Sequence, residues 1–197
     1  MKQILKIGFI LLLISSIAAF ALGFTNEVTK DRIAEQRFLA NEQAKKDVLP
    51  EAASFIDITG EDLDSIINQF EPIIEAYVGL DTSGAPIGYV FKSNPNGFSG
   101  AVEVVTGVNV AETVTGLRVG SHNETPGLGA KAKEAPFYEQ FTGKSSTSQI
   151  GVSKTAASGN DIQAITGATI SSVAISKGAN ASIDAFNWIL ENGGVGN

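Results

Sequence analysis

Residues 7–24 form an uncharged, strongly apolar run, and Lys2 and Lys6 precede it. A helix needs about 20 such residues to span the hydrocarbon core, with a lower limit of about 17. The alternative is a cleaved signal peptide, because Ala19-Phe20-Ala21 resembles an A-x-A cleavage site. The run is long for the apolar part of a signal peptide, so we predict a retained transmembrane anchor at residues 1–25. The lysines before the run predict a cytoplasmic N-terminus and a domain on the outer side.

The charge balance and the residue types narrow the function. With 14 basic and 21 acidic residues, the chain is unsuited to nucleic acid as a partner. It has no cysteine, which excludes disulfides, cysteine-ligated iron–sulfur clusters and a lipidated N-terminal cysteine. Its single histidine argues against a multi-histidine metal site, so we predict no metal. Redox chemistry would therefore require an organic cofactor.

A charged segment follows the apolar run, and its pattern between positions 27 and 48 is helical, although its apolar residues do not form a clean stripe. Pro50 ends this pattern, because proline cannot continue a helix. We predict a helical connector at residues 26–50, standing on the membrane surface, and a domain at residues 51–197.

The pattern of the domain predicts an α+β fold, in which an antiparallel sheet is flanked by helices. Turn sequences at residues 81–84 and 94–97 separate short apolar runs. Pro136 confines a further helical segment to two pieces or to a late start. The predicted strands are residues 76–80, 87–91, 100–106 and 113–119, and the predicted helices are residues 61–70 and 131–141. Residues 155–161, rich in Ser, Ala and Gly, are predicted to be an exposed connector.

A last helix is predicted to run to about Leu190. Its first half has small residues that allow close packing, and its second half carries one apolar face. We expect Trp188 to pack in the core rather than beside a cofactor, because aromatic residues at helical spacing usually do. The small residues are Ala174, Gly178 and Ala181, and the apolar face is Ile183, Phe186, Ile189 and Leu190.

Residues 165–172 precede this helix and place four hydroxyl groups around the pair Gly167-Ala168. The first turn of a helix has free backbone N–H groups, and these together with the macrodipole favour an anion. A phosphate here would meet the hydroxyls of Thr166, Thr169, Ser171 and Ser172. The local pattern alone fits an ordinary hydroxyl N-cap better.

A second stretch, residues 120–129, follows a predicted strand. Pro126, Gly127 and Gly129 give it a fixed backbone that a ligand can approach closely. The alternative is a rigid surface loop without a ligand. His122 has no recognisable partner in the sequence, so we interpret it as a solvated loop residue and assign it no role.

Thr166-Gly167-Ala168-Thr169, followed by Ile170-Ser171-Ser172, resembles the S/T-G-A-T-x-T/S motif of FMN-binding domains. Such domains occur in the G subunits of Rnf electron-transport complexes and in the C subunits of sodium-translocating NADH:quinone reductases. The stretch from Glu124 to Gly129, E-T-P-G-L-G, matches a second family motif. The anchor, this loop and the terminal motif together cover nearly the whole chain, and their combination most resembles the Rnf G subunit.

The resemblance implies FMN as cofactor, attached covalently by a phosphoester bond to Thr169. A separate flavin transferase makes this bond in the family. The implied polar contacts come from Glu124 and Thr125, and Leu128 offers an apolar face to the ring. No residue is implied to be catalytic. The remaining implied cofactor-binding residues are Thr166, Gly167, Ala168, Ser171, Gly127 and Gly129.

The resemblance further implies an electron-transfer subunit of a membrane oxidoreductase, with no independent catalytic activity. It would relay electrons between other membrane and redox subunits of an Rnf complex, which couples ferredoxin and NAD to ion transport. The chain would lie in a bacterial inner or plasma membrane as a single-pass protein. It has no nucleotide-binding motif, so NADH and ferredoxin would bind to other subunits. Two alternatives are a related flavoprotein outside an Rnf complex and a flavin-free binding or scaffold module.

One position departs from the family pattern. Relatives typically have an aspartate six positions before the acceptor threonine, where this chain has Gln163. The transferase would read that aspartate, so Gln163 bears on the efficiency of flavin attachment. The nearest acidic residue is Asp161, which could substitute through a shifted loop.

Overall fold

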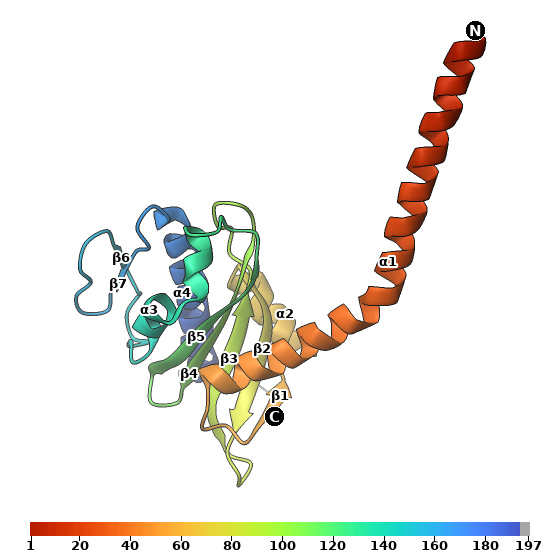
Figure 1. Cartoon of the computed structure of the whole chain (residues 1–197). Coiled ribbons are helices and arrows are strands. Elements are labelled where there is room, and N and C mark those ends of the chain that lie inside the picture. Colours follow the sequence, from red (N-terminus) through yellow and green to blue (C-terminus); the bar gives the residue numbers. More distant parts are fainter. Residues whose placement is uncertain (194–197) are drawn as a thin grey trace. The chain divides into compact units, whose positions relative to one another are not determined.

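The computed structural model describes residues 1–193 and contains two compact units, residues 1–42 and a domain that begins at Gln43 (Figure 1). Helix α1 (Lys2–Val48) makes up the first unit and supplies the first residues of the domain. The predicted anchor and connector are therefore one continuous helix, which ends two residues before Pro50. Helix α1 includes a stretch that is long and apolar enough to cross a membrane.

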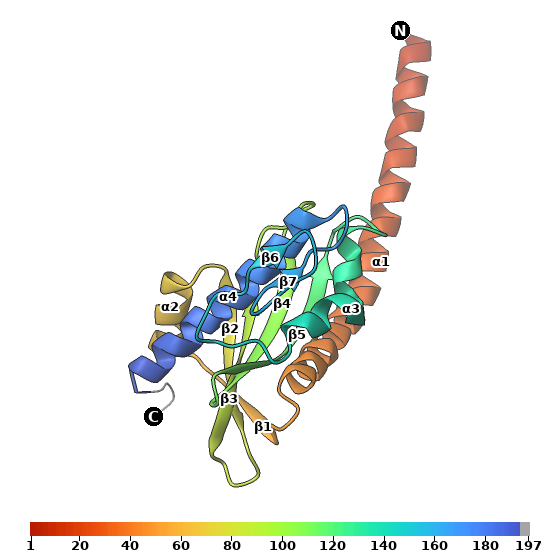
Figure 2. The same ribbon diagram turned by 90° about the vertical axis from the view of Figure 1, so that its left-hand side faces the viewer.

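The domain is built on one antiparallel sheet with the strand order β1-β2-β3-β4-β5 (Figure 2). The four predicted strands are confirmed as β2 to β5. Strand β1 was not predicted, because it is a four-residue edge strand whose side chains are mostly exposed and show no alternation. The strands are β1 (Ser54–Asp57), β2 (Ile73–Leu80), β3 (Pro86–Ser93), β4 (Val102–Asn109) and β5 (Thr113–His122).

The helices confirm the predicted α+β class. Pro136 lies in the first turn of α3, where its missing N–H costs nothing, and it separates the two predicted helical pieces. A short parallel pair, β6 and β7, encloses a mostly exposed connector, as predicted for residues 155–161. The remaining elements are α2 (Gly60–Gln69), the 3₁₀ helices η1 (Gly129–Lys133) and η2 (Glu139–Phe141), α3 (Ala135–Tyr138), β6 (Val152–Ser153), β7 (Ile162–Gln163) and α4 (Thr169–Glu191).

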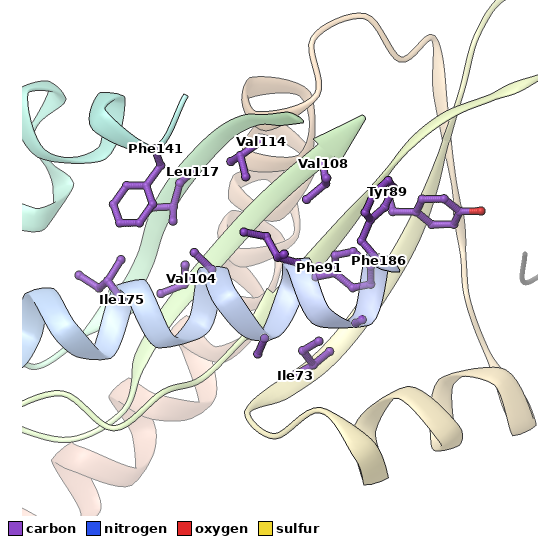
Figure 3. Packing of buried hydrophobic residues seen from close by; sticks show 14 of the residues in the cluster. Ile73, Tyr89, Phe91, Val104, Val108, Val114, Leu117, Phe141, Ile175 and Phe186 are labelled. Atoms are coloured by element: carbon purple, nitrogen blue, oxygen red, sulfur yellow. The ribbon is translucent and has the colours of Figure 1, made fainter. Parts of the chain in front are cut away.

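Helix α4 covers one face of the sheet, and the main core lies between them (Figure 3). Ile183, Phe186 and Ile189 are buried as predicted, but the prediction for Leu190 is wrong, since 42% of it is exposed. Successive helical residues point about 100° apart, so Ile189 and Leu190 cannot both face the sheet. Trp188 packs against this core, with its ring 6.1 Å from that of Phe70, which confirms the prediction.

The opposite face of the sheet receives the last turn of α1. Four glycines on adjacent strands leave a groove there, and Val48 and Leu49 fill it. The Thr115 hydroxyl donates to the Val48 carbonyl, and the Arg118 guanidinium bonds to Asp47 at 3.1 Å. The Thr115 bond satisfies a carbonyl that the helix end leaves free. The groove glycines are Gly79, Gly88, Gly107 and Gly116.

Candidate functional site

The first turn of α4 has no side-chain cap. Its N-cap position is Ala168, and Gly167 before it has a φ of +79°, which glycine adopts without strain. Among the described residues, none accepts a hydrogen bond from the backbone N–H groups of Thr169, Ile170 and Ser171. The ordinary hydroxyl N-cap is therefore wrong for this turn. Three N–H donors at the positive end of a helix are available to an anion.

The four hydroxyls near this turn have different roles. Ser172 is fully buried; it donates to the Ala168 carbonyl and accepts from the Ile165 N–H, both at 3.0 Å. The prediction that its hydroxyl meets a phosphate is wrong, because both bonds hold the turn itself. The buried Ser171 hydroxyl donates to a Glu124 carboxylate oxygen at 2.6 Å. Within residues 1–193, the Thr169 hydroxyl has no hydrogen-bond partner.

A cavity of about 320 Å³ lies at the start of α4 and brings the two sequence motifs together. Thr166 and Gly127 do not line it, and Thr166 instead faces a neighbouring hollow that also contains Lys131 and Gln163. Phe98 and Ile170 line the cavity but were not predicted. Both are exposed apolar residues, and neither carries a polar group that signals a site. The other lining residues are Glu124, Thr125, Leu128, Gly129, Gly167, Ala168, Thr169 and Ser171.

Glu124 connects the parts of this site. It is 6% exposed, and besides the Ser171 bond it accepts the Ser99 backbone N–H at 3.0 Å. Its carboxylate lies directly against Gly97 and Gly129, where any β-carbon would collide with it. Burial raises the pKa of the Glu124 carboxyl, but the bonds from Ser171, Ser99 and Phe98 and the charge of His122 together outweigh burial, so the pKa lies below its ordinary value. Glu124 is therefore charged at neutral pH.

His122 is not a solvated loop residue, so that interpretation is wrong. It ends strand β5, and its Nδ1 accepts the backbone N–H of Glu124 at 3.2 Å. Its Nε2 is buried and has no partner among the described residues. Burial lowers the pKa of His122, the charge of Lys133 lowers it further, and Glu124 opposes both.

Gln163 is exposed on β7, and its backbone N–H donates to the side chain of Gln140 at 2.7 Å. Asp161 lies at the start of the same strand pair, with its carboxylate against Gly151 and its carbonyl bonded to Lys144. Neither Gln163 nor Asp161 lines the cavity at Thr169.

Comparison with known proteins places this site in a family. Residues 97–184 match the model of the FMN-binding domain, and residues 1–48 match the model of the RnfG N-terminal region. The chain is 40% identical over 193 residues to the G subunit of the Na(+)-translocating ferredoxin:NAD(+) oxidoreductase complex of Acetobacterium woodii. That alignment covers 94% of this chain and 92% of the relative. The chain belongs to the RnfG family.

A second family member, the G subunit of the ion-translocating oxidoreductase complex of Methanosarcina acetivorans, is 33% identical over 186 residues. Its alignment covers 93% of this chain and 94% of that protein. The fold also matches the crystal structure of the C subunit of the Na(+)-translocating NADH-quinone reductase from Parabacteroides distasonis. The TM-score is 0.53, the identity is 20%, and 69% of this chain and 76% of that chain are covered. The domain thus has the fold of that reductase component.

The cavity fits the two halves of FMN, a flat ring system and a phosphate. Leu128, Ile170 and Phe98 supply apolar walls, and the first turn of α4 supplies N–H donors that no described residue accepts from. A cavity with apolar walls and a few directed polar groups is the usual form of a cofactor site. Gly129 allows the parts of the site to approach closely, because a β-carbon there would press on Glu124 and Ser171.

Proposed function

We propose that this chain carries FMN covalently on Thr169 and relays electrons within an Rnf-type complex that links ferredoxin and NAD to ion transport. The observation that carries the proposal is the position of the Thr169 hydroxyl. It lies at the cavity, in the first turn of α4, beside three N–H groups that have no partner in the described chain. Membership of the RnfG family supports the choice of cofactor and of complex.

The first turn of α4 would hold the phosphodiester. Its charge would lie beside the N–H groups of Ile170 and Ser171, and a helix start stabilises such a charge by about 0.3–1 kcal/mol at an exposed site. Ser171 would act through its backbone, since its hydroxyl is bonded to Glu124. The Thr169 hydroxyl reacts once, in a maturation step catalysed by a flavin transferase, and afterwards serves as a tether.

The cavity walls would orient the ring. Leu128 and Ile170, 42% and 57% exposed, both present apolar surface to the cavity. Bound FMN supplies one- and two-electron redox chemistry, and the protein sets its position and its surroundings. Thr125, which also lines the cavity, would offer a hydroxyl to the polar edge of the ring.

Helix α1 would anchor the domain in the membrane as a single span. Lys2 and Lys6 precede its apolar stretch and favour a cytoplasmic N-terminus, with the domain on the outer side. A covalent tether suits that side, where a dissociated cofactor would be lost. Other membrane and redox subunits of the complex would then be the partners in electron transfer.

The test compares wild type, Thr169→Val and Thr166→Val, each expressed in a host with a membrane flavin transferase. Valine keeps the shape of threonine but lacks its hydroxyl, and Thr166 is the matched control two residues before Ala168. We expect flavin fluorescence on a denaturing gel, and an intact mass increased by FMN, in wild type and Thr166→Val only. Fluorescence that persists in Thr169→Val would move the attachment site, and no flavin in wild type would refute the proposal.

The relay itself needs an assay in the assembled complex. In membranes that contain the other subunits, Thr169→Val should assemble normally but lose ferredoxin-dependent reduction of NAD. Full activity of an assembled, flavin-free variant would show that the electrons take another route.

A further inference from the structure

His122 is the only histidine of the chain, and it lies two residues before Glu124. Its Nδ1 accepts the Glu124 backbone N–H at 3.2 Å. A ring nitrogen that accepts a hydrogen bond carries no proton, so the imidazole is neutral and its proton is on Nε2. That nitrogen is buried, and no described residue is bonded to it.

The bond from Glu124 to His122 fixes the backbone at the point where strand β5 gives way to the loop 123–129. The side chain of Glu124 then reaches both Ser171, at 2.6 Å, and the Ser99 backbone N–H, at 3.0 Å. A shift of the Glu124 backbone would therefore disturb the loop before β4 and the first turn of α4 together. His122 does not line the cavity, so any effect on the site must pass through Glu124.

We propose that neutral His122 is a positioning residue of the cofactor site, and that protonation of its Nδ1 releases the Glu124 backbone and loosens the loop 123–129 against α4. The inference rests on the proposed function only where it names the flavin as the molecule that this loop touches. The hydrogen bonds that carry it lie within the chain.

Two charged groups act on the imidazole. Lys133 of η1 opposes protonation, and the Glu124 carboxylate favours it. The paired residue on β4, Val102, has no charge. Burial is the largest influence and holds the pKa of His122 below its ordinary value of 6.5. The unfolded chain therefore takes up a proton at a higher pH than the folded chain, and this contribution to stability falls as the pH drops below 6.5.

Two substitutions distinguish the role of His122 as a hydrogen-bond acceptor from the effect of its protonation. In His122→Asn, the side-chain oxygen can accept the N–H two residues later, as in an Asx turn, and it does not titrate. His122→Phe keeps a ring but removes the acceptor at every pH. We expect the asparagine variant to keep the hydrogen bond from the Glu124 N–H at all pH values. The phenylalanine variant should lack this bond already at neutral pH, as protonated His122 does.

The experiment uses the full chain in lipid nanodiscs, without a histidine tag, and with ¹⁵N-labelled histidine and backbone. A single histidine gives a single pair of ring signals. We expect the Nε2–H tautomer at neutral pH, a midpoint below 6.5, and a Glu124 amide signal that moves with the same midpoint. The Glu124 signal should lose this transition in His122→Asn. In the flavin-loaded protein, the visible circular dichroism should show the same transition.

The Nδ1–H tautomer at neutral pH, or a Glu124 amide that ignores the histidine titration, would overturn the inference. So would a flavin signal that keeps its pH transition in His122→Asn. The NMR signals are also measured on Thr169→Val, which is expected to carry no flavin. Failure to load flavin would thus refute the proposed function, while the titration still decides the role of His122.

Discussion

Replacing Glu124 with alanine should destabilise the domain, because this residue joins three segments that are distant in sequence. Its carboxylate accepts hydrogen bonds from Ser171 on α4 and from Ser99 before β4. Glu124 itself follows β5. In Glu124→Ala both donors lose their acceptor, and the space between Gly97 and Gly129 is left unfilled.

The size of the effect follows from burial. Ser171 is 1% exposed, and a buried donor without a partner costs about 1–3 kcal/mol. The Ser99 N–H belongs to an exposed residue and can bond to water, so its loss adds little. Removing a buried charge offsets part of the cost. We expect a loss of about 2 kcal/mol in the free energy of unfolding, or about 4–8 °C in Tm for a domain of this size.

Trp188 provides the assay, because it is the only tryptophan and packs against the domain core beside Phe70. Its fluorescence during urea unfolding reports the domain without interference from α1. Glu134→Ala, the same change at an exposed glutamate, is the control and should change stability by less than about 0.5 kcal/mol. Glu124→Gln keeps two polar atoms in place and should lose about 1 kcal/mol. Equal losses for glutamine and alanine, or none for alanine, would refute the reasoning.

Three further outcomes follow from the same contacts. Gly107→Ala would drive a β-carbon into the Val48 carbonyl and should lower the free energy of unfolding by about 1–3 kcal/mol in the same assay. An unchanged unfolding midpoint would show that the last turn of α1 does not dock there. Gly129→Ala would press on Glu124 and Ser171 and should reduce flavin attachment, measured by intact mass, more than it reduces stability. The pKa of Glu124 is lowered in the folded domain, so the ionised carboxylate stabilises the domain above the ordinary pKa of 4.5. This stabilisation should be lost in the same unfolding assay as the pH falls through the pKa of the folded state. Glu124→Gln should not show this loss.

The sequence was sufficient for the parts of the fold that depend on periodicity. Strands β2 to β5 and helix α4 have clear apolar patterns and strong turns between them, and the structure has all of them. Strand β1 has no such pattern, since it is held at an edge by pairing with β2 alone. The groove on the outer face also has no local signal. The glycines there are explained by atoms distant in sequence, such as those of Val48 and Leu49 and, at Gly88, the backbone of Val108 on the neighbouring strand.

For the site, the two motifs located the cavity, but some of their side chains have other roles in the structure than the sequence predicts. The hydroxyl-rich sequence predicts that Ser172 faces an anion, whereas in the structure its hydroxyl makes two hydrogen bonds that hold the turn. Phe98 lines the cavity from the loop before β4, and this loop is held to Glu124 by the Ser99 N–H, a long-range contact that no local pattern reveals. The role of His122 has no signal in the sequence, because its partner is a backbone N–H and a sequence shows no such donor.

The link between the motifs explains why they occur together in one chain. Residues 124–129 and 166–171 are separated by a span that contains η1, α3, η2 and the β6–β7 pair, so local folding cannot align them. The bond from Ser171 to Glu124 joins the two stretches directly, and Gly129 allows them to approach closely. A substitution at Glu124 should therefore affect a tether at Thr169, since Glu124 lines the same cavity and holds Ser171. Loss of flavin in Glu124→Ala, with a folded domain by Trp188 fluorescence, would show that attachment requires the Glu124 carboxylate, and normal loading would refute this.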